Sequence, residues 1–514
     1  MGITGNWDRR LSRRTFIGLG GMSAAALVLG SKGVLSQTSG AAGYGELVQD
    51  PGGLLDLPPG FQYRVISEQD VTRLSSGAPV PGDFDGMAAY PGPSSNTAVL
   101  VRNHELRPPD IGTTPGTDRP VYDPVYGGNP YDPAAPGGTT GVVVNLDDRT
   151  SVEEFATSSG TLNNCAGGAT PWGTWLTCEE DRTTGHGYVF EVDPNNPENE
   201  LSRTPIRSMG FFSHEAVDID PATGIAYLTE DDFRGSIPDD PRDEIVADVP
   251  DTEGGSGTRV SFLYRYIPND RGQRPGALQQ GGRLQVMALK KRRNYNVDLA
   301  FPGNRFQVIW KDVNPEEPHE NAEQVGAAQF GRLEGAYFAG GAFWFDDTIG
   351  GEARLGQIFR YLPSSNTLEL FYEGTERGKM ESPDNIVVTP WGDLWFAEDE
   401  AVDGDTVNRV MGITPDGQVY PFATNRLNDS EFAGPTFSPD GKTFFVNYQN
   451  PGITFAVWGP FQQSNASRQQ QMAVAAPPKS MTPNVSGELA EAARKFGMSP
   501  LEAAAYDRLG ASIA

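Results

Sequence analysis

The sequence predicts an all-β protein, a six-bladed β-propeller followed by a short C-terminal helical tail. Two observations lead to this fold class. The 514 residues include 62 glycines and 41 prolines, and this abundance favours short strands joined by turns over long helices. In addition, one local pattern recurs six times: a turn, then an apolar strand, then polar or acidic side chains at the end of that strand.

The six copies of this pattern lie about 69 residues apart on average, whereas a compact propeller blade needs about 40 to 50 residues. Each repeat therefore has room for four strands and a loop. A pair of β-sandwiches with incidentally similar hairpins is the alternative architecture. The six copies are Pro91–Glu105, Pro171–Asp181, Asp220–Asp232, Ala339–Asp347, Pro390–Asp399 and Pro439–Gln449.

The N-terminal segment is predicted to be an export signal. Arg13 and Arg14 precede a mildly apolar run over residues 17–30, which is typical of a twin-arginine signal. This run is too short for the alternative, a membrane anchor, because spanning a bilayer takes about 20 apolar residues. We expect residues 1–43 to be a signal peptide and linker recognised by the twin-arginine export machinery. The mature protein is then exported to the periplasm or the medium, without a membrane span.

Two later segments depart from the repeating pattern. Residues 231–258 are dominated by acidic residues, Pro and Gly, which predicts a long surface loop. Residues 462–483 are rich in Gln, Ala and Pro and are expected to form a linker, after which two short helices are predicted. We therefore expect residues 44–460 to form the propeller and residues 461–514 to form a linker and helical tail. The tail is expected to be docked on the propeller or loosely held, and partner binding is the alternative.

The charge of the chain indicates which partners are possible. The 67 acidic residues exceed the 40 basic residues by 27, which excludes a nucleic-acid backbone as a partner. Carboxylates are instead the preferred ligands of calcium and magnesium. Because the innermost strands of a propeller line a central channel, six acidic strand ends are expected to meet at one mouth. Such a group of carboxylates requires a cation.

The sequence lacks the motifs of several common hydrolases. It has four histidines, no H-E-x-x-H, no C-x-x-C and no G-x-S-x-G, so neither a typical zinc site nor a nucleophile elbow is supported. Cys165 and Cys178 could form a disulfide in an exported protein, or Cys178 could act as a metal ligand. Glu179 and Glu180 favour the second interpretation, because a thiolate beside carboxylates suits iron or another transition metal.

Two further segments carry residues suited to phosphate and to calcium. Arg332 and Glu334 would lie on one face of a strand, and the planar guanidinium of arginine matches phosphate; a simple ion pair is the alternative. Asp384, Glu398 and Asp399 offer hard oxygen ligands for calcium, although Pro-Asp sequences also occur routinely in turns.

The stretch from Asn163 to Glu180, which contains NNCAGG followed by TPWGTWLTCEE, resembles the signature of PhoX-type alkaline phosphatases. The resemblance covers most of residues 45–460 and implies a six-bladed propeller. It also implies an iron and calcium cluster at the channel mouth that hydrolyses phosphate monoesters. Other segments that resemble landmarks of this family follow the same order: Asn103-His104-Glu105, His214-Glu215-Ala216, F-x-R-x-E ending at Glu334, Ser382-Pro383-Asp384, and Gly434 to Asn447.

By matching motif, the resemblance implies that Cys178 is an iron ligand and that Arg332 clamps the phosphate. The complete set of candidate metal ligands is Cys178, Glu179, Glu215, Glu105, Glu334, Asp384, Glu398 and Asp399, and the candidate catalytic residues are Arg332, Glu334 and Asn164. Leu333 stands where the family usually has Pro, and Glu398-Asp399-Glu400 replaces its usual T-D-G. The metal stoichiometry is therefore left open.

The expected function is that of a secreted, monomeric phosphatase acting on small phosphate monoesters, with iron and calcium as cofactors. Two alternatives belong to other classes. A calcium-dependent lactonase-like propeller would need neither Cys178 nor Arg332. A non-catalytic propeller would bind a partner on its acidic face and would turn over neither phosphate esters nor lactones.

Overall fold

The computed structural model describes residues 42–108, 125, 127–197, 199–232, 260–399 and 407–461. Residues 1–41 and 42–514 form separate units, and the following concerns the second. The predicted signal peptide, the helical tail and most of the predicted loop over residues 231–258 lie outside the described residues. None of the described helices has the length and apolar character needed to cross a membrane.

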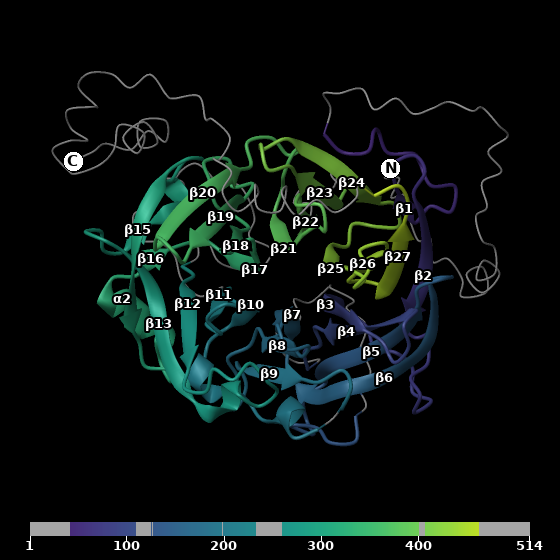
Figure 1. The fold of residues 1–514 in the computed structure, drawn as a ribbon, viewed down its shortest axis with the longest axis horizontal. Coiled ribbons are helices and arrows are strands. Elements are labelled where there is room, and N and C mark those ends of the chain that lie inside the picture. Colours follow the sequence, from purple (N-terminus) through teal and green to yellow (C-terminus); the bar gives the residue numbers. More distant parts are fainter. Residues whose placement is uncertain are drawn as a thin grey trace, which may run out of the picture. The chain divides into compact units, whose positions relative to one another are not determined.

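The described chain is all-β and propeller-like, with antiparallel sheets arranged around a centre (Figure 1). One four-stranded sheet has the order β3 (Phe84–Pro91), β4 (Thr97–His104), β5 (Gly137–Asn145), β6 (Thr150–Thr161). The other has the order β2 (Gln62–Glu68), β27 (Ile453–Trp458), β26 (Phe444–Tyr448), β25 (Phe432–Phe437). A three-stranded sheet contains β7 (Asn164–Ala169), β8 (Trp175–Glu179) and β9 (Val189–Val192).

The remaining sheets are larger or very short. A five-stranded sheet has the order β1 (Leu55–Asp56), β24 (Val419–Asn425), β23 (Arg409–Ile413), β22 (Leu394–Glu398), β21 (Pro383–Val388). A nine-stranded sheet has the order β10 (His214–Ile219), β11 (Ala226–Glu230), β12 (Leu263–Pro268), β13 (Gly282–Leu289), β15 (Arg305–Asp312), β20 (Thr367–Glu373), β19 (Gln357–Leu362), β18 (Ala342–Asp347), β17 (Leu333–Ala339). The short strands β14 (Tyr295–Asn296) and β16 (Ala328–Gln329) pair in parallel.

The helical elements in the described residues are short. The α-helix α2 (Pro318–Val325) begins with Pro in its first turn and ends at Gly326, whose left-handed backbone (φ 77°, ψ 55°) lets its N–H bond the carbonyls of Ala322 and Glu323. The 3₁₀ helices are Leu201–Arg203, Arg207–Met209, Leu278–Gln280 and Val297–Leu299.

The predicted all-β, propeller-like class is confirmed, and the six copies of the sequence pattern correspond to strands β4, β8, β11, β18, β22 and β26. The sequence pattern predicted that these six strands are the innermost ones, but they are not. The innermost strands immediately precede them along the chain. They are β3, β7, β10, β17, β21 and β25, and each contacts the next, so that the six close into a ring (Figure 1).

Two of the expected repeats share one sheet through strand β15. The first part of this strand, Arg305–Gln307, pairs with β20, whereas Val308–Asp312 pairs with β13. A single long strand thus hydrogen-bonds to both neighbours, which joins them into the nine-stranded sheet. Elsewhere the ends of the described chain close the ring, because β2 near the N-terminus pairs with β27 near the C-terminus.

The core lies between neighbouring sheets. Successive side chains of a strand point to opposite faces, and both faces are covered here. On β18, Phe343 packs against Tyr227 of β11, in the other half of the nine-stranded sheet, with ring centroids 5.1 Å apart, while Trp344 packs with Ile386 and Phe396 of the neighbouring five-stranded sheet. The strands that follow the innermost ones along the chain, such as β18, are therefore continuous apolar runs. For this reason they were the most visible feature of the sequence.

Each innermost strand contains a β-bulge near its start. On β3 the register shifts between Phe84 and Met87, and equivalent shifts occur on the other five innermost strands. A bulge bends the strand and redirects its side chains. On β3 and β17 the second bulge residue is glycine, because the next strand comes close: a Cβ on Gly86 would lie 2.7 Å from the Ala166 Cα, and one on Gly335 would lie 2.2 Å from the Asp384 carbonyl oxygen.

Candidate metal centre

Five of the six bulges begin with an acid or a thiol. We call these five residues the inner ring: Asp85 of β3, Cys165 of β7, Glu215 of β10, Glu334 of β17 and Asp384 of β21. All five are buried. On the sixth strand, β25, the register shifts between Ala433 and Thr436, and the residues there are neither acids nor thiols.

The inner ring contains two overlapping groups of possible metal ligands. The ligand atoms of Glu215, Glu334 and Asp384 all lie within 4.8 Å of one another. The same is true of Cys165, Glu180 and Glu215, in which Glu180 joins from the residue just after β8. Glu215 belongs to both groups and therefore connects a thiol-containing set of donors with a set of oxygens only.

Burial and mutual repulsion raise the pKa values of the inner-ring groups. Burial, and then the charge of neighbouring carboxylates, raises the pKa of Asp85, Glu215 and Glu334 well above the usual range. The same causes raise the pKa of Asp384 to about 8. Burial and the nearby Glu215 raise the pKa of the Cys165 thiol. So many anions at one place must be neutralised by protons or by bound cations.

Arg332 lies beside the ring. Its Nη2 is 2.7 Å from the Glu334 Oε1 and 2.7 Å from the Asp231 Oδ2, and its Nε donates to the same Asp231 oxygen at 3.1 Å. The Arg332 side chain is 22% exposed although its acidic partners are almost fully buried. The guanidinium is thus held by two carboxylates while part of the side chain still reaches solvent.

A second set of charged residues surrounds the Glu180 carboxylate. The Arg107 Nη2 lies 3.1 Å from the Glu105 Oε1 and 3.3 Å from the Glu180 Oε2, and Asn163 donates to Glu180 at 2.8 Å. The predicted ligand Glu105 also accepts a hydrogen bond from Gln449 at 2.7 Å. Glu105 therefore lies near the ring, already held by Arg107 and Gln449.

Asp399 also lies near the ring. Its charge is the next cause, after burial, that raises the pKa of Asp384. Burial and the Asp399 carboxylate likewise raise the pKa of Glu431 well above its usual value. Asp399 and Glu431 thus add carboxylates on the side where β25 interrupts the acidic series.

Cys178 and Glu179 belong to neither of these two ligand groups. Cys178 lies opposite the bulge at Cys165 and packs in the apolar core, with no exposed surface. The Glu179 carboxylate accepts a hydrogen bond from Leu162 N at 2.9 Å and is 2.6 Å from the His186 Nδ1. It also accepts from the backbone of Gly187 and Tyr188, so its oxygens are already engaged in holding loops.

Asn164 and Glu398 are also engaged in structural contacts. Asn164 accepts from Thr161 at 2.6 Å and donates to Thr177 at 2.9 Å. Glu398 accepts two hydrogen bonds from Arg409, at 2.6 and 2.7 Å. Glu398 does not belong to a ligand group of the described residues. Both cysteines are free thiols, so the disulfide that the sequence left open is not formed.

Five further residues stand at this candidate site that were not selected from the sequence: Asp85, Cys165, Glu180, Asp231 and Glu431. Their signal was present but lay in the strand before the conspicuous one. An acid or Cys followed by Gly, Ala or Asn occurs at the start of five innermost strands, as in Asp85-Gly86 and Glu334-Gly335. The pattern becomes informative only once these pairs are known to form equivalent bulges.

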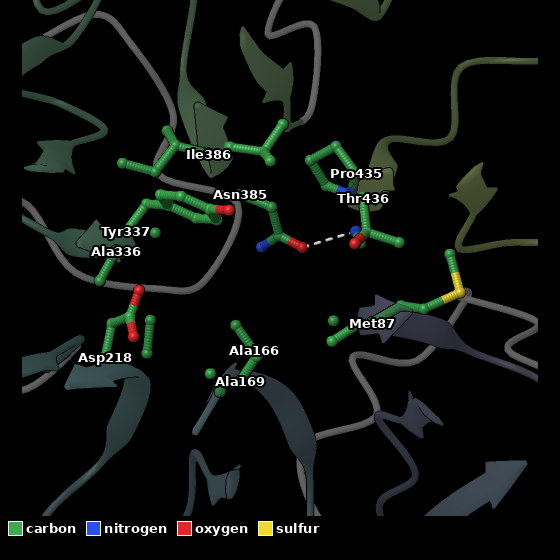
Figure 2. Close-up of a pocket in the computed structure, with 18 of the residues that line it drawn as sticks. Met87, Ala166, Ala169, Asp218, Ala336, Tyr337, Asn385, Ile386, Pro435 and Thr436 are labelled. Atoms are coloured by element: carbon green, nitrogen blue, oxygen red, sulfur yellow. Dashed lines mark hydrogen bonds between the residues drawn. The ribbon is translucent and has the colours of Figure 1, made fainter. Parts of the chain in front are cut away.

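A cavity of about 490 Å³ (Figure 2) is lined by residues that come directly after those of the inner ring along the chain. Its walls include second bulge residues, such as Ala166 and Asn385, and residues that follow the bulges, and most of these wall residues are small or apolar. Asp218 from β10 and Tyr337 from β17 add polar groups to the wall (Figure 2). The Asp218 carboxylate accepts hydrogen bonds from Phe338 N and Ile219 N, both at 2.6 Å.

Asp218 should make stability depend on pH. Burial raises its pKa to about 7, against about 3.9 in an unfolded chain. Between these values the folded protein holds a proton that the unfolded chain releases, so the stabilisation is full below about pH 4 and is lost as pH rises towards 7.

We therefore expect the free energy of unfolding of wild type to fall, relative to that of Asp218→Asn, by up to about 4 kcal/mol between pH 4 and 7, at about 1.4 kcal/mol per unit. Urea unfolding of both proteins at several pH values measures this difference. Parallel pH profiles would contradict the assignment.

The fold and the site together define an all-β, propeller-like protein with a candidate metal centre where its innermost strands begin. The chain belongs to the alkaline phosphatase PhoX family, whose family model matches residues 42–237 and 241–452. No curated protein matches the sequence.

Among solved structures, the chain is similar to *Pseudomonas fluorescens* PhoX in complex with vanadate, a transition state analogue. The TM-score is 0.60 at 18% identity, covering 79% of this chain and 96% of that one. A gluconolactonase from *Xanthomonas campestris* matches with a TM-score of 0.38 at 10% identity, over 80% of this chain and all of the other. At 18% identity the first likeness supports the fold.

Proposed function

We propose that this protein is an exported, metal-dependent phosphatase that hydrolyses small phosphate monoesters at the inner ring, with iron and calcium as its metals. The observation that carries this proposal is the combination of a buried thiol–carboxylate ring with Arg332 beside it, in a chain of the PhoX family. We further propose a monomeric, six-bladed propeller over residues 44–460, because six innermost strands carry equivalent bulges.

The chemistry of the donors supports two kinds of metal. Cys165, Glu180 and Glu215 combine sulfur with oxygen, which suits iron. The group that Glu215 forms with Glu334 and Asp384 offers oxygens only, which suits calcium. Within the described part of the chain, the buried Asp85 Oδ1 has no hydrogen-bond partner. A buried oxygen without a partner is expected where a metal ion binds.

These contacts change the ligand set that the resemblance implied. We propose Cys165 in place of Cys178 and Glu180 in place of Glu179, and we add Asp85. Glu215, Glu334 and Asp384 remain proposed ligands, and Asp399 and Glu105 remain candidates beside them. Glu398 and Asn164 leave the proposed site, because Arg409 and two threonines already engage their polar atoms.

When bound, the metals would act as Lewis acids towards the phosphate oxygens and the leaving alkoxide. The chain's own contribution is orientation. Asp231 and Glu334 fix the plane of the Arg332 guanidinium, so that it can donate to phosphate oxygens without first being ordered. The buried surroundings strengthen these charge interactions, because little water is present to screen them.

Purified protein is expected to contain both iron and calcium and to hydrolyse a chromogenic phosphate monoester. Removal of calcium with a selective chelator should abolish turnover, and added calcium should restore it. Elemental analysis and a phosphatase assay measure both quantities, and a lactone assay separates the lactonase alternative. Full activity in iron-free protein would contradict the iron assignment, and metal-loaded protein without any turnover would favour the non-catalytic alternative.

A further inference from the structure

We propose that Arg182 and His319 form a cationic clamp that positions Asp231, and through it Arg332, for the reaction proposed above; the inference rests on that proposed function. Neither clamp residue belongs to the inner ring. Arg182 follows β8, and His319 lies in the first turn of α2. Both contact the end of β11, next to the residue that holds Arg332.

The end of β11 carries three consecutive carboxylates, Glu230, Asp231 and Asp232, and all three are at most 1% exposed. In extended chain, alternate side chains point in opposite directions. The structure follows this rule, because Asp231 contacts Arg332 whereas Glu230 and Asp232 both contact His319. The two outer carboxylates therefore share one side and the middle carboxylate faces the site.

The two outer carboxylates share His319, and each has one further side-chain donor. The His319 Nδ1 lies 2.9 Å from the Glu230 Oε1 and 3.3 Å from the Asp232 Oδ2. The Arg182 Nη1 lies 2.5 Å from the same Asp232 oxygen. The other Glu230 oxygen accepts a hydrogen bond from the Tyr264 hydroxyl at 3.1 Å. The clamp therefore supplies the cations that the outer pair requires.

Charge balance explains why the clamp matters for Arg332. Buried carboxylates without cations are strongly destabilising, and adjacent carboxylates also repel one another. Without the clamp, Glu230 and Asp232 would repel Asp231 and compete with it for Arg332. With the clamp, Asp231 is the carboxylate of this segment that pairs with the arginine of the site.

The surroundings of His319 agree with a cationic role. The first turn of a helix disfavours a cation, and burial by itself lowers the pKa of the imidazole. The Glu230 and Asp232 carboxylates outweigh both effects and raise the pKa of His319 to about 9. These three residues could also hold a metal ion, since their ligand atoms lie within 4.8 Å of one another. The guanidinium of Arg182 on Asp232 favours the clamp, because it already supplies the positive charge.

A double-mutant cycle between His319→Gln and Arg332→Lys tests the proposal. His319→Gln should lower the turnover number by about 10- to 100-fold with unchanged metal content, because a misplaced positioning group costs rate. In the Arg332→Lys background the same change should have little further effect. His319→Lys, which restores the charge, should recover most of the activity.

The matched control is Arg360→Gln, which removes a different buried ion pair, with Glu369, on β19 and β20. Its effect on turnover should be the same in the wild-type and Arg332→Lys backgrounds. An equal loss of turnover from His319→Gln in both backgrounds, or a loss of melting temperature alone, would overturn the clamp. A zinc ion bound by wild type but not by His319→Gln would also overturn it, in favour of a metal site.

The cycle also separates this inference from the proposed function. If wild type turned over no phosphate ester, the proposed function would fail, and the same four proteins would still be compared by melting temperature. Residues coupled through Asp231 should then give non-additive shifts, whereas independent residues give additive ones. Additive shifts in that case would overturn the clamp as well.

Discussion

Arg332→Lys is expected to retain its metals and to lose about 100- to 1000-fold in turnover number, the usual contribution of a preorganised electrostatic group. Lysine keeps the positive charge but not the planar fork that can bond Asp231 and two phosphate oxygens at once. The loss should appear in the turnover number as well as in the Michaelis constant, because the phosphate gains charge interactions in the transition state.

Glu334→Gln provides the comparison for this variant. Glu334 contacts Arg332 but is also a proposed metal ligand, so its loss should lower the metal content as well as the rate. The competing interpretation makes Arg332 and Glu334 a structural ion pair. In that case both variants would lose melting temperature and keep turnover. Unchanged turnover in Arg332→Lys rules out a phosphate-binding role for Arg332. Full metal content in Glu334→Gln removes Glu334 from the ligand set.

Cys165→Ser is expected to lose the proposed iron and most of the activity, whereas Cys178→Ser should retain both. The Cys165 sulfur lies within 4.8 Å of ligand oxygens of Glu180 and Glu215, and a hydroxyl is a poor substitute for a thiolate on iron. Cys178 is buried in the apolar core, where a serine hydroxyl without a good partner costs about 1 to 3 kcal/mol. Its serine variant should therefore lose stability and keep its metal.

The two cysteine variants serve as controls for each other, because the chemical change is the same and only the place differs. Elemental analysis, turnover and urea unfolding on both proteins decide between the positions. Loss of iron from Cys178→Ser with full iron in Cys165→Ser would return the assignment to the residue that the family motif suggested.

Much of the fold could be predicted from local patterns. The six predicted apolar strands that end in polar residues are all present, as β4, β8, β11, β18, β22 and β26. They could be predicted because a buried strand has a continuous apolar sequence between two turns. The nine-stranded sheet could not be predicted, since it depends on how far β15 extends past two neighbours. That extent is set by long-range pairing and not by the local sequence.

The candidate site was predicted in part. Arg332, Glu334, Glu215 and Asp384 were chosen from their motifs, and the structure brings them together. The sequence favoured Cys178 as a metal ligand, whereas the structure groups Cys165 with Glu180 and Glu215; local sequence separates the two cysteines poorly, because both stand in apolar strands beside polar residues. In a regular strand their side chains would alternate predictably, but the bulge at Cys165 breaks that alternation.

The sequence by itself determined that this protein is an all-β, propeller-like member of its family, and it determined which chain segments carry the acidic and thiol groups. Turn residues and apolar runs act over a few residues, so their effect can be read locally. Only the tertiary structure decided which of those groups face one another. The bulges redirect side chains at places where neighbouring strands come close to one another. The close approach of Gly86 to Ala166 is an example, and it brings together residues about 80 positions apart in the sequence.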